Sequence, residues 1–490
     1  MSELDRFVED PARRERAADV GDRMRAAGVE YVYVQHVTVT GRVVGKGIPV
    51  EHWQDVADSG VQMVYGSVAD LAVDRHGRYL GYPPEASELV SVPEPDTYAQ
   101  LPWDRRVARV FGRLFRNRDE RTDPGGVLTS DCRGNLARQH EEFRRRHDGL
   151  ELRVGTEPEM MWLRRDAAGG VTGTTRPDCY HIEQFETLRP VTLRVIEYAR
   201  AMGLDMIQGD HEDAPGQLEL NFNYDEVRRN ADRLVTYRQI CRQVAREHGL
   251  VATFMAKPFG GLSGSGCHHN MSLWQGGQDG VAARDGDGAA PEVSARRTGG
   301  VNAFLDTAGS RQPSKLALHC IGGILEHLPA LTAIGSSTVN SYRRLLDTGF
   351  WAPVRANWGV QNRTCAVRVS APGRVEYRSV DAMVNPYLMG SALLAALDDG
   401  IAHAVDPGPP QDSSAYDDPG DRGDRDGFPP RALPESLGDA LRALRADAVI
   451  SGALPGDMSR VYHDVKRAEW ERFLAVPTAW DVETYLDCVP

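Results

Sequence analysis

The chain has 490 residues, of which 41% are hydrophobic and 26% charged, a composition typical of a globular protein with a large core or two domains. Its net charge of −13 excludes a basic nucleic-acid-binding surface, and no uninterrupted apolar run reaches the roughly 20 residues that span a membrane. The seven cysteines are dispersed without CxxC pairs and the N-terminus lacks a signal-peptide pattern, so we expect reduced thiols and a cytoplasmic location.

The first predicted elements belong to a small N-terminal domain. Residues 11–27, with a proline at the start and a glycine just past the end, predict a helix. Residues 29–50 show the pattern of two or three strands with a Thr-Gly turn. A proline-rich stretch follows at 81–103, and we place a domain boundary after it. The chain would then divide into residues 1–105 and a larger α/β domain over 106–490.

The larger domain alternates strand-like segments with long amphipathic helices. The strand-like segments are 151–163, 216–224, 364–370 and 374–379, and a helix is predicted over 318–334. This mixture predicts an α+β fold.

The stretch GTEPEMMW places Glu157 and Glu159 two residues apart in a predicted strand, so that both side chains face one side. Two carboxylates on one face repel each other, and each is costly to desolvate unless a cation lies beside it. Hard divalent cations such as Mg²⁺ and Mn²⁺ prefer oxygen ligands. The pair therefore indicates a metal site, with two exposed acids at a strand edge as the alternative.

Two further stretches carry candidate ligands. In HEDAPGQLELNF, Glu212 and Glu219 flank a Pro-Gly turn, although a charged loop before a half-exposed strand gives the same pattern. Residues 255–274 lack the Walker spacing, but their glycines allow a ligand to approach the backbone. His268 there is a candidate imidazole ligand, and His269 would point the other way and is expected to be structural. Glycine-rich loops are common, so this stretch alone is weak support.

A later stretch, NSYRRLLDTGFWAPV…QNRTCAVRVSAPGRVEYRS, brings five arginines near Glu376. Clustered arginines suit bidentate binding of carboxylates and phosphates. A surface salt-bridge network is the alternative. The arginines are Arg344, Arg363, Arg368, Arg374 and Arg378.

Taken together and in this order, these stretches resemble the glutamine synthetase family. The matching motifs are ExE, PGQxE, KPFxGxxGSGxH, NSYxRL, NRxxxxR and ExR followed by NPYL, and the resemblance runs from about residue 25 to the C-terminus. It implies an N-terminal β-grasp domain and a large catalytic domain with a mainly antiparallel sheet. It also implies a homo-oligomer, usually a dodecamer of two hexameric rings, with active sites between neighbours.

The resemblance also implies a role for each matched residue. One metal would be held by Glu159, Glu212 and Glu219, and the other by Glu157, His268 and Glu376. ATP would contact Lys257, Ser272, Arg363, Arg368 and Arg374. Glutamate would contact Glu159, Arg344, Arg378 and the backbone at Gly264. Arg344 and Arg363 would act in catalysis, because metals and arginines neutralise ATP and stabilise the transferring phosphoryl group.

The chain departs from the family pattern at the ammonium site. Ammonia-using members carry a glutamate in a GYEAP flap and an aspartate in a DGSS sequence. Here DTGFWAP, one residue longer, puts Trp351 at the first position, and VYGSV puts Tyr65 at the second. Smaller departures are Ser263 for the usual asparagine and Asn270 for a common histidine.

These departures predict an amine other than ammonia as the acceptor. An alkyl ammonium resembles lysine, with a pKa of about 10.4, and needs a base before it attacks. A weakly basic aromatic amine is already neutral near pH 7 and would stack on Trp351 and Tyr65. We therefore expect an ATP-dependent γ-glutamylamide synthetase for a bulky, aromatic or apolar amine, with Mg²⁺ or Mn²⁺ as cofactor.

Several alternatives stay open. Tyr65 and Trp351 could be packing residues, which would leave an ordinary ammonia-dependent glutamine synthetase. A ligase for aliphatic amines or polyamines should show extra acids near the entrance. An inactive regulatory ring is disfavoured because all six expected metal ligands are present. Tyr416 lies where some members are adenylylated on a loop tyrosine, although the same Tyr-Asp pair also occurs unmodified.

Overall fold

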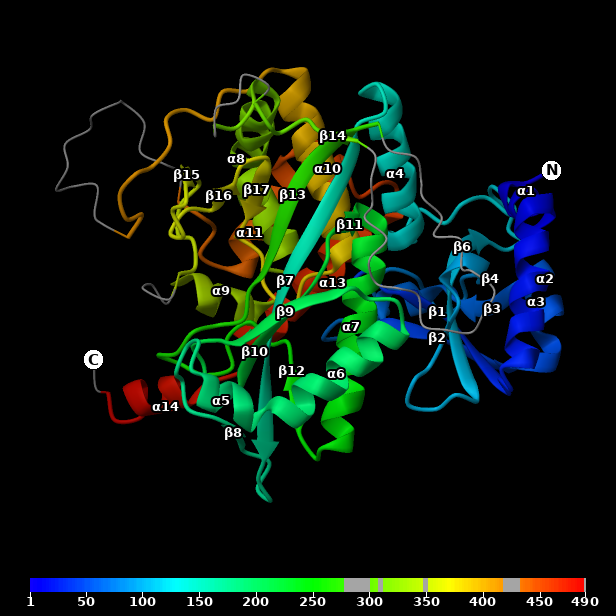
Figure 1. The fold of residues 1–490 in the computed structure, drawn as a ribbon, viewed down its shortest axis with the longest axis horizontal. Coiled ribbons are helices and arrows are strands. Elements are labelled where there is room, and N and C mark those ends of the chain that lie inside the picture. The colour runs from blue at the N-terminus through cyan, green and yellow to red at the C-terminus, as the bar shows by residue number, and fades with distance from the viewer. Residues whose placement is uncertain (277–299, 307–311, 347–350, 417–431, 489–490) are drawn as a thin grey trace.

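The computed structural model describes residues 1–276, 300–306, 312–346, 351–416 and 432–488 (Figure 1). The helices are α1 (Glu3–Glu9), α2 (Pro11–Ala26), α3 (Trp53–Ser59), α4 (Cys132–Arg146), α5 (Ile182–Thr187), α6 (Arg189–Ala201), α7 (Val227–Glu247), α8 (Lys315–Gly335), α9 (Val339–Leu346), α10 (Pro386–Ala402), α11 (Leu437–Ala446), α12 (Ala448–Gly452), α13 (Asp457–Leu474) and α14 (Ala479–Tyr485), with short 3₁₀ helices η1 (Val50–His52), η2 (Tyr65–Ala69) and η3 (Pro95–Thr97). The strands are β1 (Tyr31–Val37), β2 (Val43–Pro49), β3 (Val61–Val64), β4 (Glu88–Pro93), β5 (Ala99–Gln100), β6 (Val107–Arg116), β7 (Glu151–Arg165), β8 (Val171–Gly173), β9 (Met206–His211), β10 (Gln217–Phe222), β11 (Asp225–Glu226), β12 (Val251–Thr253), β13 (Cys267–Gln275), β14 (Val301–Asn302), β15 (Trp358–Val360), β16 (Val367–Ala371) and β17 (Arg374–Tyr377).

The N-terminal part of the chain forms a six-stranded sheet at one end of the molecule, drawn in blue in Figure 1. Its order is β2-β1-β6-β4-β3, with β5 beside β6, and only the pairing of β1 with β6 is parallel. The predicted helix and strands are confirmed as α2, β1 and β2, whereas α1 and the strand β4 inside the proline-rich stretch were not predicted. Because β6 begins at Val107, this sheet extends past residue 105, and the division into 1–105 and 106–490 stays a prediction.

The larger sheet has the order β15-β16-β17-β13-β7-β10-β9, and four short strands pair with β7 or β13. Among the described strands of this sheet, every pairing is antiparallel except that of β15 with β16. The long strands β7 and β13 cross the middle of the molecule side by side (Figure 1). The expected mixture of helices with a mainly antiparallel sheet is therefore present.

The two faces of the larger sheet differ in chemistry because successive side chains of a strand alternate. One face of β7 and β13 presents apolar side chains to the main core, among them Met160, Trp162, Met271 and Leu273, all at most 1% exposed. The other face carries the acids and the histidine predicted as ligands. One face of the sheet thus packs on the hydrophobic core, and the opposite face carries the polar side chains of the predicted site.

Helix α8 is the one described helix that is long and apolar enough to cross a membrane. In the protein, 72% of its apolar window is buried, and it packs against α10 and α11. Pro329 lies inside it. Its apolar character therefore fits a core helix, and it is more fully buried than the predicted amphipathic pattern indicated.

A buried ion cluster links the N-terminal sheet to the helices of the larger part. Glu94, which follows β4 and is 8% exposed, accepts hydrogen bonds from Arg113 of β6 (2.8 Å) and Arg133 of α4 (2.6 Å). Arg228 of α7 donates a third at 3.3 Å. These guanidinium groups outweigh the burial of Glu94 and hold its pKa well below the usual value.

Candidate active site

The strand register gathers the predicted acids on one face of the larger sheet. Glu157 of β7 lies opposite His268 of β13, and Glu159 lies opposite Glu219 of β10. Glu376 of β17 lies opposite Asn270 of β13. Residues that are opposite in adjacent strands project to the same side, so these side chains form one continuous acidic face.

The tightest cluster on this face is formed by Glu157, His268 and Glu376. One ligand atom from each lies within 4.8 Å of the others, the only such trio among the described residues. His268 Nδ1 is 3.3 Å from Glu157 Oε2 and 3.4 Å from Glu376 Oε1. Burial and the nearby Arg378 hold the pKa of His268 well below its usual value, so the imidazole is neutral, the form that binds metals. Two carboxylates and a neutral imidazole fit a divalent cation such as Mn²⁺.

The acids predicted for the second metal are repelled by one another. Burial and the carboxylates of Glu157 and Glu159 raise the pKa of Glu219 well above its usual value. Burial and Glu159 raise the pKa of Glu212 to about 8, and burial raises that of Glu159 to about 6. Arg344 near Glu159 and Arg363 near Glu212 offset only part of this effect. Buried acids that repel each other therefore fit a bound divalent cation, which would stabilise their charged forms.

Several residues that the sequence did not single out as supports hold these acids. Asn270 donates to Glu157 Oε1 (2.8 Å), and Gln217 donates to Glu159 Oε2 (2.9 Å). The amide of Gly266 also donates to Glu159 Oε2 (2.9 Å). A further carboxylate, Asp210 of β9, lies opposite Glu219, and burial with Glu157 raises its pKa to about 6. The alternation of polar residues along β9, β10 and β13 is the sequence pattern from which these supporting residues could have been predicted.

The five predicted arginines differ in how they meet the acidic face: three are in contact with its residues, Arg363 lies near Glu212 and His268, and Arg374 lies apart. Arg344 and Arg378 are buried, and each has a guanidinium nitrogen within 3.5 Å of a ring nitrogen of His268. Arg378 and Arg368 both donate to Glu376, the latter at 2.8 Å. Arg363 and Arg374 are exposed, and Arg374 donates to Ser370.

An open hollow of about 420 Å³ beside these arginines is lined by Trp351, Arg363 and the segments 360–364 and 412–414. The Trp351 side chain is 56% exposed, and its backbone carbonyl accepts from Arg378 Nη2 at 3.1 Å. The next carbonyl, of Ala352, accepts from Tyr416 at 2.8 Å. Residues 347–350 of the DTGFWAP stretch lie outside the described part of the chain.

Other predicted site residues are placed differently. Tyr65 is 4% exposed and its ring packs against Tyr82, with centroids 5.1 Å apart, so the single chain does not bring it to Trp351. Lys257 is buried and its ammonium donates to the carbonyl of Leu262 in its own loop. Ser272 projects from β13 farther along the face, where its hydroxyl accepts from Trp274.

Gly264 and Ser263 complete the glycine-rich loop. The carbonyl of Gly264 accepts from Gln217 at 2.9 Å, and a Cβ at Gly264 would meet the carbonyl of Ala256 at 2.4 Å. Ser263 donates to Asp213 at 2.6 Å. The loop is therefore fixed to β10 and the segment before it, which positions its backbone beside the acidic face.

Comparison with known proteins relates this site to a family. The family model "Glutamine synthetase, catalytic domain" matches residues 129–301 and 281–485. The chain is 33% identical to a glutamine synthetase of Pyrococcus furiosus, covering 93% of this chain and 96% of the relative, and 30% identical to one of Rhizobium meliloti, covering 96% and 99%.

Two solved structures are also similar. One is described as "GmaS/ADP complex-Conformation 1", with a TM-score of 0.81 and 30% identity over 96% of this chain and 100% of that one. The other, "Apo GmaS without ligand", has a TM-score of 0.79 and 30% identity over 96% and 99%. The chain therefore belongs to the glutamine synthetase family of ATP-dependent glutamate ligases.

Proposed function

We propose that this enzyme joins the γ-carboxylate of glutamate to an amine other than ammonia, bulky and aromatic or apolar, through γ-glutamyl phosphate. The observation that carries this proposal is the exposed ring of Trp351 in the hollow that Arg363 also lines. An indole ring at this point offers an apolar, stacking surface to an acceptor. The similarity to GmaS structures, one of them an ADP complex, supports the ATP-dependent ligase part of the proposal.

The family uses ATP and divalent metals such as Mg²⁺ or Mn²⁺. In our proposal one ion is held by Glu157, His268 and Glu376, and a second by Glu159, Glu212 and Glu219. These ions would neutralise the phosphate charge of ATP when bound. ATP would extend along the face past Ser272, Arg363 and Arg368 toward Arg374 at its margin, with Lys257 holding the adjacent loop.

The chain's own residues then have distinct tasks. Arg344 and Arg378 would bind the carboxylates of glutamate, for which a planar guanidinium is suited. The backbone at Gly264, close to Arg344, would border the same substrate. The γ-carboxylate attacks the terminal phosphorus of ATP and releases ADP, and the amine then attacks the acyl carbon and releases phosphate. Arg363 would stabilise the phosphoryl group during its transfer.

The class of acceptor follows from the chemistry of the Trp351 side chain. A neutral aromatic amine at pH 7 needs no strong base to attack, whereas ammonium must first lose a proton. Trp351 supplies no base. Tyr65 is part of this proposal only as a residue contributed across a boundary between subunits, since it is buried near Tyr82 within one chain.

The test is phosphate release from ATP with glutamate and Mg²⁺, measured against ammonium, alkylamines, polyamines and anilines, with products identified by mass. We expect turnover with an aromatic amine and little with ammonium. Efficient turnover with ammonium would overturn the acceptor assignment and leave an ordinary glutamine synthetase. A preference for polyamines would assign the acceptor to the aliphatic class.

The remaining parts of the proposal concern the N-terminal fold, the oligomeric state and the cellular location. A β-grasp class for the N-terminal sheet is supported by its mixed pairing, in which β1 and β6 are parallel. A cytoplasmic homo-oligomer, with the dodecamer as the expected form, follows from the resemblance. Light scattering of the purified protein tests the ring size directly.

A further inference from the structure

His327 of α8 lies between two carboxylates that come from different elements. Its Nδ1 is 2.7 Å from Oδ2 of Asp447, which precedes α12, and its Nε2 is 3.1 Å from Oδ2 of Asp399 in α10. The side chain of His327 is 9% exposed, and those of Asp447 and Asp399 are 16% and 18% exposed. Both ring nitrogens are therefore engaged at a place that water reaches poorly.

This geometry determines the protonation state of the imidazole. An ionised carboxylate only accepts hydrogen bonds and a neutral imidazole has one donor, so only the doubly protonated ring satisfies both contacts. Asp447 acts as an acceptor on its other oxygen too, since Oδ1 accepts from the amides of Val449 and Ile450, each at 3.0 Å. Although burial opposes the charge, the hydrogen bonds to Asp447 and Asp399 raise the pKa of His327 above its usual value.

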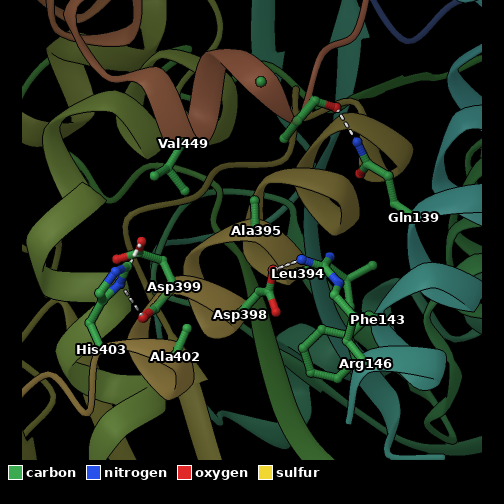
Figure 2. Close-up of a pocket in the computed structure, with 12 residues that line it drawn as sticks. Gln139, Phe143, Arg146, Leu394, Ala395, Asp398, Asp399, Ala402, His403 and Val449 are labelled. Atoms are coloured by element: carbon green, nitrogen blue, oxygen red, sulfur yellow. Dashed lines mark hydrogen bonds and ion pairs between the residues drawn. The ribbon is translucent and has the colours of Figure 1, made fainter.

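The other ionisable groups around this contact, in the part of the chain that the structure describes, are exposed or already paired. Helix α8 packs against α10, α11 and α12, and α12 carries no ionisable side chain. The exposed groups are Glu326 of α8, Arg442 and Arg445 of α11 and His403 at the end of α10, and the paired groups are Asp439 with Arg442 and Asp398 with Arg146 and His147. His403 also contacts the second oxygen of Asp399 at 3.0 Å (Figure 2).

The two ends of α12 are held by different kinds of contact. At the N-terminal end, Asp447 caps the helix and reaches His327. At the C-terminal end, the carbonyl of Ala453 accepts from the amides of Asn135 and Gln139 in α4, at 3.1 and 2.6 Å. Side-chain amides do not titrate, whereas an imidazole changes its charge near neutral pH. Only the N-terminal attachment is therefore sensitive to pH.

Helix α12 also forms one wall of a cavity of about 330 Å³, between it and the helices α4 and α10 (Figure 2). Val449, Gly452 and Ala453 line the cavity from this side. A helix beside an unfilled space lacks part of the dispersion contacts that close packing provides. The position of α12 consequently depends more on the contacts at its ends.

We propose that His327, Asp399 and Asp447 form a pH-sensitive latch, which holds α12 against α8 and α10 while the imidazole is charged and loosens it when the ring loses a proton. A neutral ring can donate to one carboxylate only, so the other is left without this donor. Because the folded-state pKa of His327 lies above the unfolded value of about 6.5, the stabilising contribution is present below pH of about 6.5 and is lost as pH rises through the folded-state pKa. The latch stands whichever amine the active site uses.

The experiment is hydrogen exchange of the full-length enzyme, followed by mass spectrometry on the α12 peptide at about pH 6 and about pH 9 and corrected for the intrinsic exchange rate at each pH. We expect the protection of α12 to fall about 10-fold or more at the higher pH, which corresponds to the loss of one charge-assisted hydrogen bond. Peptides from α2, in the N-terminal part of the chain, report any general response to pH.

His327→Gln should remove the pH response of α12, because the glutamine amide does not titrate. His319→Gln, on the same helix, is the matched control and should keep the wild-type response. A response that persists in His327→Gln would overturn the latch, as would equal protection of α12 at both pH values in wild type. If His327→Gln does not fold, Asp399→Asn takes its place: with one carboxylate left on the ring the response should shrink, and an unchanged response would refute the proposal.

Discussion

Arg378 donates from Nη2 to the backbone carbonyl of Trp351 at 3.1 Å. The same guanidinium contacts Glu376 and lies 3.5 Å from His268. One buried arginine thus joins the predicted metal ligands to the residue that we assign to the acceptor. Since Tyr416 holds the next carbonyl, of Ala352, the backbone at this point is fixed from two directions and the indole has a defined place.

Trp351→Glu should shift the acceptor preference from an aromatic amine toward ammonium. A carboxylate at this position could take a proton from ammonium, and a positioned general base contributes about 100-fold or more to rate. We expect kcat/KM for ammonium to rise about 100-fold and turnover of an aromatic amine to fall. Trp351→Phe, which keeps an aromatic ring, is the matched control and should retain the aromatic amine. Unchanged preferences in both variants would show that Trp351 does not contact the acceptor.

Asn270→Ala should weaken metal binding without removing a ligand. Asn270 orients Glu157 through a 2.8 Å hydrogen bond, and loss of such a partner typically lowers metal affinity about 10–100-fold. Mn²⁺ titration followed by calorimetry measures the change. Ser272→Ala, two residues along the same strand, should leave Mn²⁺ affinity in the absence of ATP unaltered. Equal affinities of wild type and Asn270→Ala would remove Glu157 from the ligand set.

Metal affinity should increase with pH between about 6 and 8. Burial and neighbouring carboxylates raise the pKa of Glu159 to about 6 and of Glu212 to about 8, so protons occupy these groups at lower pH. A cation must displace those protons, so binding is weakest at pH 6 and levels off above pH 8. Calorimetry in buffers of different ionisation enthalpy counts the released protons. In Glu212→Gln the rise between pH 7 and 8 should shrink to the part contributed by Glu219, whose pKa is also raised. A pH-independent affinity in wild type would contradict the assignment.

Gly266→Ala should impair activity although it adds one methyl group. A Cβ at this position would lie 2.8 Å from His268 Nε2 and 3.0 Å from Glu159 Oε1, so two predicted ligands must move. A displacement of about 1 Å can cost about 100-fold in rate. Gly260→Ala is the matched control, because nothing lies within 4 Å of its added Cβ. Similar turnover in both variants would mean that activity does not depend on the exact positions of His268 and Glu159.

Glu94→Ala should destabilise the protein by about 3–5 kcal/mol, because three guanidinium groups lose their buried partner. Denaturant unfolding measures the difference at pH 7. The folded-state pKa of Glu94 lies below its unfolded value, so the contribution is present above the unfolded pKa and is lost as pH falls toward the folded one. The variant should therefore lose less stability than wild type between pH 5 and 3, and parallel pH profiles would contradict the role of this carboxylate.

The strands that carry the site could be predicted because their signal is local. The alternation that places Glu157 beside Glu159 and Glu376 beside Arg378 is a property of single segments, and β7 and β17 lie where it indicated. The helix over 318–334 was likewise confirmed as α8. In contrast, β4 was not predicted, because the prolines and polar residues of the stretch 81–103 hide its strand pattern, and only its pairing with β3 and β6 makes it a strand.

The sequence by itself determined the set of acids, the histidine and the arginines, since their types and order suit a cation and phosphate groups whatever the fold. Only the tertiary structure decided which of them meet. The register of β7, β13 and β17 brings Glu157, His268 and Glu376 within 4.8 Å, whereas packing turns Lys257 into its own loop and Tyr65 into the core. Register depends on pairing between segments about 100 residues or more apart, and side-chain direction depends on what the neighbouring elements leave free. No local pattern encodes either.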